Sequence, residues 1–249
     1  MENSNCFPGS RYPQWPYPWP FPFPFPFPDQ FPPYLLSIAN TGGSSHNALL
    51  DEYAIAFPAF DGTREQMWNV MINGTTRLTK EVGITGGSFP SFKVANDFAT
   101  KIKANLDKVL NEMVKSGEMT PFIAEQTQIM LAIIKDASSF EVADRRLAAF
   151  SNRISFRTDI AVNDKIILTF AASTAMSTND FWSEALVNPA SPYHDIAITL
   201  GAANLFKIKI ADLIGFVVGA VVGSGGGPVG SVTTGIALGG FASEVFGEK

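Results

Sequence analysis

The residues most suggestive of chemistry are His46, Asp51 and Glu52, where an imidazole and two carboxylates invite interpretation as a metal site or an acid–base pair. Side chains on a helix meet when they are three or four positions apart. His46 is five and six positions from the two carboxylates, so the three do not converge on one helix face. We therefore expect them to belong to the start of a helix, with Ser44 or Ser45 as its N-cap and the acidic residues in its opening turns.

Few other residues could support catalysis. The chain has two histidines, His46 and His194, and one cysteine, Cys6, so an internal disulfide and a Cys-rich metal site are excluded. The sequence contains no phosphate-binding loop, no GxGxxG, no GxSxG elbow and no HExxH pattern. Arg157 beside Asp159 is expected to form a solvated ion pair and not an anion site. We expect no enzymatic activity, no cofactor and no metal, and no small-molecule substrate is evident.

The most distinctive pattern lies near the C-terminus, where no charged residue interrupts residues 213–243. Glycines at every fourth position, before Pro228 and again after it, are typical of a glycine zipper: Gly215, Gly219, Gly223, Gly227, Gly235 and Gly239. Small residues at this spacing let two helix backbones approach closely, even in lipid, where no hydrophobic effect drives association. We predict that these glycines mediate helix packing together with Phe216 and Leu238.

The length of this segment limits how it could enter a membrane. Residues 224–228, Ser-Gly-Gly-Gly-Pro, should break any single helix, which leaves two arms of about 11 to 13 residues, or ~16 to 20 Å each. Crossing a bilayer takes about 20 apolar residues, so neither arm spans alone. The arms could form a shallow or re-entrant hairpin, insert together through a thinned bilayer, or line a pore in many copies, with Lys207 and Lys209 as headgroup anchors. A hairpin buried within protein also needs close-packed small residues, so that alternative stays open.

The N-terminal segment alternates proline with aromatic residues over residues 13–33. Proline fixes φ and restricts the preceding residue, so a stiff extended arm is expected. So many rings form an apolar surface that needs cover, in a groove of its own domain, in a neighbouring subunit or at a lipid interface. The rings that we expect to dock are Trp15, Tyr17, Trp19, Phe21, Phe23, Phe25 and Phe27.

The composition of the whole chain limits the kinds of partner that it could bind. The 249-residue chain has a formal net charge of −5, and no clustered basic excess of the kind that nucleic-acid binding requires. Eleven of the 17 prolines precede Tyr34, which leaves roughly 210 residues to bury a core. The first residues have no cationic segment followed by an apolar one, and no lipobox precedes Cys6. We expect synthesis in the cytoplasm, followed by membrane association or export by a non-classical route.

A short motif gives a family resemblance. His46-Asn47 with Leu50-Asp51 and Tyr53, followed by an amphipathic helical body and a glycine-rich tail, resembles a group of uncharacterised small Bacteroidota proteins that carry an HNxxLD-type motif near the N-terminus. The resemblance covers the two ends of the chain and implies a bacterial source, without an assigned activity. The Pro/aromatic arm is a departure from that group.

The middle of the chain shows helical periodicity and helix-start signals. Thr63 with Gln66, and Ser138 with Glu141, have the spacing of capping boxes, and Thr120 precedes a first-turn proline. After a Gly/Ser linker within residues 34–45, we expect a helix that opens at residues 61–66 and ends or is interrupted at residues 73–75, and further helices over residues 92–115, 122–137, 142–150, 163–176, 179–187 and 196–210.

These observations predict a mainly α protein. Its parts are an extended Pro/aromatic arm over residues 1–34, a bundle of five or six helices over residues 35–206, and a glycine-zipper helical hairpin over residues 207–249. We expect a membrane-interacting, oligomerising protein of the pore-forming or bacteriocin-like type, whose partners are further copies of itself and a lipid bilayer. The alternative is a structural subunit of a self-assembling filament, shell or surface layer, in which the Pro/aromatic arm docks into a neighbouring copy.

Overall fold

The computed structural model describes residues 33–58, 60–81, 83, 85 and 87–247, and the described part contains helices and no strand. The predicted helical bundle is confirmed, although it has more helices than expected. In chain order they are α1 (Pro33–Ala56), α2 (Arg64–Glu81), α3 (Phe92–Ala104), α4 (Leu106–Ser116), α5 (Pro121–Lys135), α6 (Phe140–Ser155), α7 (Val162–Val187), α8 (His194–Val222), the short 3₁₀ helix η1 (Gly223–Gly226) and α9 (Gly227–Gly247). All the rings predicted to dock from the N-terminal arm lie outside the described residues.

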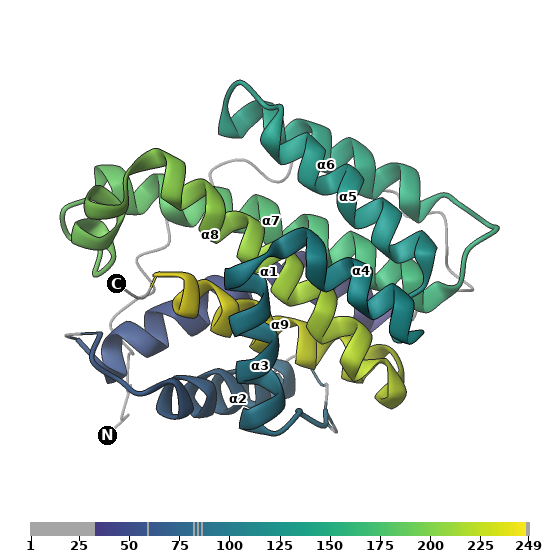
Figure 1. Cartoon of the computed structure of the whole chain (residues 1–249), viewed down its shortest axis with the longest axis horizontal. Helices are drawn as coiled ribbons and strands as arrows, with labels where there is room; N and C mark the ends of the chain where they lie inside the picture. The colour runs from purple at the N-terminus through teal and green to yellow at the C-terminus, as the bar shows by residue number, and fades with distance from the viewer. Residues whose placement is uncertain (1–32, 59, 82, 84, 86, 248–249) are drawn as a thin grey trace, which may run out of the picture.

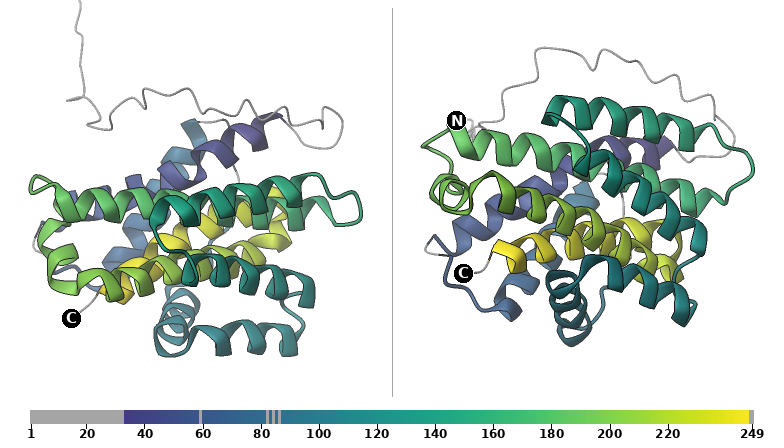
Figure 2. Two further views of the ribbon diagram at one scale, coloured as in Figure 1. Left: turned by 90° about the horizontal axis from the view of Figure 1, so that it is seen from above. Right: turned by 45° about the horizontal axis from the view of Figure 1, so that its top comes forward.

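The last helix lies at the centre of the arrangement. α9 packs against α8, α1, α2, α3 and α7, whereas α5 and α6 pack mainly on α7 and on each other. Figure 1 accordingly shows α5 and α6 together along one side, α2 and α3 on the other, and α9 between them. The two turned views in Figure 2 keep the yellow α9 inside the molecule. The element at the C-terminus is therefore the core around which earlier helices pack.

Several helix ends follow from the signals that the sequence carries. The hydroxyl of Thr63 accepts a hydrogen bond from the backbone N–H of Gln66, while the Gln66 side chain accepts one from the Thr63 N–H, which confirms this capping box. Thr120 caps α5, and Gly117 ends α4 with a left-handed φ of 76°. Ser139, and not Ser138, caps α6, because it is the Ser139 hydroxyl that accepts from Val142.

Two stretches predicted as breaks are helical. The Gly/Ser stretch expected as a linker lies within α1, and a Cβ on Gly43 would come 1.9 Å from the hydroxyl of Ser177 in α7. The interruption predicted at residues 73–75 is also absent, since α2 continues through Gly74, where a Cβ would come 2.4 Å from Leu49 of α1. In both places glycine allows α1 to approach a neighbouring helix, and packing outweighs the low helix propensity.

Two further boundaries differ from prediction. The helix expected over residues 92–115 is split at Asn105, whose backbone is extended (φ −164°, ψ 101°) and whose side chain caps α4. The separate helices expected over residues 163–176 and 179–187 form the single helix α7. Asn179 remains helical there because its side chain is buried and donates a hydrogen bond to Asp144 of α6.

Candidate functional site

The predicted C-terminal hairpin is present. α8 runs as one helix across the expected boundary at residue 207, apart from a non-helical Gly201, and ends at Val222. The predicted break at residues 224–228 is confirmed, because η1 occupies residues 223–226 and Gly227 adopts a φ of 70° that reverses the chain into α9. The turn residues Gly225 and Gly226 have open space around them.

Glycines bring the two helices of the hairpin into close approach. A Cβ on Gly219 would lie 2.5 Å from the carbonyl oxygen of Thr234, and one on Gly223 would lie 2.2 Å from that of Gly230. A Cβ on Gly215 would lie 2.9 Å from the carbonyl oxygen of Leu238. Real Cβ atoms do not make such contacts with backbone, so any side chain at these positions would force α8 and α9 apart.

The other predicted packing residues contribute in different ways. Gly235 lies against the ring of Phe216, at 3.0 Å from an added Cβ, while Gly239 leaves 3.4 Å to the nearest atom. Phe216 is fully buried and stacks on Phe170 of α7 with ring centroids 6.3 Å apart. Leu238 is also fully buried. Gly227 belongs to the turn and makes no close packing contact.

The hairpin is enclosed by protein. Every residue from 230 to 245 of α9 is buried, as is every residue from 208 to 221 of α8. Phe241 of α9 meets Trp68 of α2, with ring centroids 5.4 Å apart, and Phe92 of α3 at 6.4 Å. Among the described residues, no helix combines the length and the apolar character needed to cross a bilayer.

The two lysines predicted as headgroup anchors have opposite environments. Lys207 is exposed, whereas Lys209 is only 1% exposed and lies above the ring of Phe140 from α6. Burial lowers the pKa of Lys209 to about 7, although the negative charges of Asp144 and two further carboxylates act in the opposite direction. Burial raises the pKa of Asp144 to about 7, although the hydrogen bond from Asn179 acts in the opposite direction. The pKa values of both side chains therefore lie near neutral pH.

A buried ion pair joins α8 to α1. Nε2 of His46 lies 3.4 Å from Oδ1 of Asp212, and both side chains are inaccessible to solvent. Burial lowers the pKa of His46, but the carboxylate of Asp212 and the contact with Asn47 outweigh that effect and raise it above its ordinary value. Asn47 in turn donates to the carbonyl oxygen of Ser177 in α7. The charged form of His46 is thus held inside the bundle, between α1, α7 and α8.

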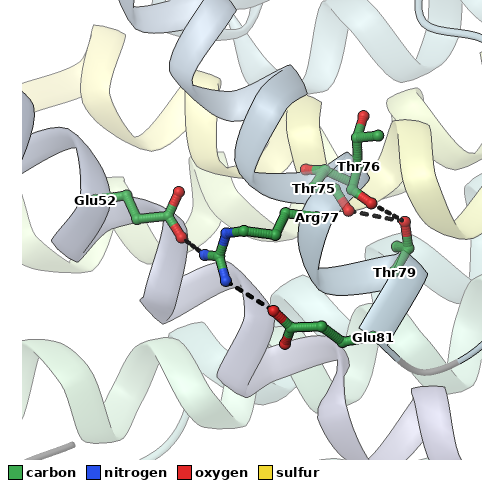
Figure 3. Close-up of polar contacts among 6 residues, drawn as sticks. All are labelled: Glu52, Thr75, Thr76, Arg77, Thr79 and Glu81. Carbon is green, nitrogen blue, oxygen red and sulfur yellow. Dashed lines mark hydrogen bonds and ion pairs between the residues drawn. The ribbon is translucent and has the colours of Figure 1, made fainter. Parts of the chain in front are cut away.

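The carboxylates that follow His46 in the sequence do not join it in a metal site. Glu52 pairs with Arg77 of α2, which also contacts Glu81 at 3.0 Å (Figure 3). No group of three or more His, Cys, Asp or Glu residues in the described part of the chain could hold a metal ion. Arg157 pairs with Asp159 at the surface, as predicted.

Sequence reasoning missed the pairing of His46 with Asp212 and the grouping of Lys209 with Asp144. The available signal was the spacing of Lys209 and Asp212, which are three positions apart and therefore lie on the same side of α8. Their partners come from α1 and α6, far away in the chain, and no local pattern identifies them. The site is therefore a glycine-packed hairpin with charged groups buried against its outer side.

Comparisons with known proteins found no family model that matches this chain, and no similar protein among curated sequences or solved structures.

Proposed function

We propose that this chain is a membrane-active, oligomerising protein of the pore-forming or bacteriocin-like type, which stores the α8–α9 hairpin inside its bundle and delivers it to a lipid surface. One observation carries the proposal: the long stretch without charged residues, 213–243, is folded as a hairpin and covered by α1, α2, α3 and α7. Covering an apolar hairpin with other helices keeps it from water until another apolar phase is available.

The glycine faces supply a means of assembly. Inside the bundle Gly215 and Gly219 of α8 pack against α9. In lipid the hydrophobic effect no longer holds the hairpin to the other helices, and small-residue faces become the surfaces through which helices associate. Hairpins from several copies can then pack together through the same glycine faces that join α8 to α9 within one copy.

The buried charges favour release and limit its depth. Removing ions from water is costly, and His46, Asp212 and Lys209 are all buried, so opening the bundle returns hydration to them. Charged groups are also expensive at the centre of a bilayer. We therefore expect the hairpin to enter the interface, to a depth of about 5 to 10 Å.

An engineered disulfide between α9 and the loop before α3 tests the proposal. A Cβ at Gly87, in the loop before α3, would lie 2.9 Å from the Cβ of Thr233 in α9. A disulfide needs about 3.5 to 4.5 Å, which a small shift of this loop supplies. In a Cys6→Ser background, Gly87→Cys with Thr233→Cys should therefore tie α9 to the bundle when oxidised.

The readouts are flotation with liposomes and release of an enclosed dye. The reduced protein should float and release dye, the oxidised protein should do neither, and reductant should restore both. The matched control, Gly87→Ser with Thr233→Ser, should be insensitive to oxidation. Leakage that persists in the locked protein would contradict hairpin release. Soluble polymers without flotation, lost when residues 1–34 are removed, would instead favour the self-assembling structural subunit.

A further inference from the structure

A cavity of about 350 Å³ lies outside the hairpin contact, where the C-terminal end of α9 meets α1, α7 and the first turns of α8. This volume is within the range of small-molecule sites, about 300 to 1,000 Å³. Four aromatic side chains line it, namely Tyr53, Phe60, Trp182 and Tyr193. Thr199 of α8 also lines the cavity and is exposed, so the cavity reaches solvent on that side.

The aromatic wall is held rigidly. The rings of Phe60 and Tyr193 meet edge to face with centroids 5.0 Å apart, and those of Trp182 and Tyr193 do so at 5.5 Å. The Tyr193 hydroxyl contacts the carbonyl oxygen of Leu50 at 2.6 Å and Oε1 of Glu244 at 2.7 Å. A wall fixed in this way loses little conformational freedom when a ligand binds.

Two buried polar atoms at the cavity make no hydrogen bond within the described part of the chain. They are Nε1 of Trp182 and Oγ of Ser243. Both residues line the cavity and are at most 2% exposed. A buried donor without a partner costs free energy, which a ligand oxygen recovers when it accepts the hydrogen bond.

Among the described residues that line the cavity, Glu244 is the one that carries a charge. Glu244 lines it and is 8% exposed, and no Lys, Arg or His is among the described lining residues. A cation gains from the negative face of an aromatic ring and from a carboxylate, whereas the carboxylate of Glu244 repels an anion.

We propose that this cavity binds a small organic cation, with its ammonium group between Glu244 and the aromatic wall, an apolar body in the remaining volume, and a hydroxyl or carbonyl oxygen near Trp182 and Ser243. The site requires neither lipid nor a second copy, so this inference stands independently of the proposed function.

Three molecules of nearly equal shape test the inference by calorimetric titration of the full chain. They are benzyl-dimethyl-(2-hydroxyethyl)ammonium, its neutral carbon analogue 3,3-dimethyl-4-phenylbutan-1-ol, and the anion 3,3-dimethyl-4-phenylbutanoate. We expect the cation to bind one site about tenfold more tightly than the alcohol, and the anion to bind most weakly. No saturable binding of the cation, or equal affinity for cation and alcohol, would overturn the inference.

Variants locate the site. Glu244→Gln keeps an acceptor for Tyr193 and removes the charge, so the cation and the alcohol should then bind equally well. Thr199→Trp should fill the cavity from its exposed rim and abolish binding of all three molecules without disturbing the core. Glu184→Gln, which removes an exposed carboxylate outside the lining, should change neither affinity. A cation preference that survives Glu244→Gln, or binding that survives Thr199→Trp, would show that the cation binds elsewhere.

Discussion

Two helix pairs of this bundle, α8–α9 and α5–α6, are built on different physical principles. In α5 and α6 one side buries large side chains such as Met130 and Phe150, and the other side is exposed and charged. Each begins at a side-chain cap, Thr120 or Ser139. The hairpin has almost no exposed side, and its close contact is made by backbone at Gly219 and its neighbours.

The two helix pairs should differ in how well they tolerate sequence changes. The outer pair is stabilised by side chains that are present, so surface changes there leave the packing intact. The hairpin instead depends on glycines, whose lack of a side chain lets α8 and α9 approach closely. Its charged side chains at Lys209 and Asp212 face protein and not solvent.

Breaking the buried ion pair of His46 and Asp212 should destabilise the protein most. His46→Leu leaves the Asp212 carboxylate buried without its cation, which should lower the free energy of unfolding by about 3 to 5 kcal/mol. His46→Leu with Asp212→Leu should recover most of that loss, because an apolar pair removes the desolvation cost. Urea unfolding at pH 7 followed by circular dichroism measures both. A double variant as unstable as the single one would show that the unpaired charge is not the cause.

Adding one methyl group to the hairpin contact should cost somewhat less. In Gly219→Ala the new Cβ would lie 2.5 Å from the Thr234 carbonyl oxygen, so α8 and α9 must separate. We expect a loss of about 3 kcal/mol in the free energy of unfolding, at the upper end of overpacking effects. Gly225→Ala in the turn, where nothing lies within 4 Å, is the matched control and should be close to neutral. Equal effects at the two positions would refute the close backbone contact.

Replacing the buried lysine should have a pH-dependent effect. The folded-state pKa of Lys209 is about 7, below its unfolded value, so its contribution to stability is present above the unfolded pKa and is lost as pH falls toward 7. Lys209→Met should therefore stabilise the protein by about 2 kcal/mol near pH 6, and the gain should shrink toward pH 10.5. Unfolding curves at pH 6, 8 and 10 measure this trend. A gain that grows with pH would contradict the assignment.

The smallest effect belongs to the surface beyond α6. Arg157 pairs with Asp159 in solvent, and Asp159 has its pKa lowered to about 2 chiefly by the hydrogen bond from Arg157. Arg157→Gln should leave the unfolding midpoint at neutral pH unchanged within error, because exposed ion pairs contribute little. A shift as large as that of Gly219→Ala would remove the contrast between surface and hairpin.

The sequence was sufficient for those features that depend on neighbouring residues. The capping box of Thr63 and Gln66, the cap at Thr120 and the break before Pro228 all depend on local chemistry and are present as predicted. The fold class followed from the same signals.

Features set by distant contacts were not predictable. From the sequence alone, Gly43 is typical of a linker, but in the structure it packs against Ser177 of α7. Asn179 is likewise typical of a helix end, but in the structure its side chain donates a hydrogen bond to Asp144. The pairing of His46 with Asp212 likewise requires α1 and α8 to be packed together. In each case tertiary packing outweighs local propensity, which is a weak guide by itself.

The most direct measurement of hairpin storage and release is hydrogen exchange of the full chain in water and on liposomes. In water the amides of α2 and α9 should both exchange slowly, because Trp68 and Phe241 pack together. On liposomes we predict that α2 loses protection as α9 leaves it, while α9 stays protected in lipid. Liposome-bound protein in which α2 and α9 exchange as they do in water would contradict release of the hairpin.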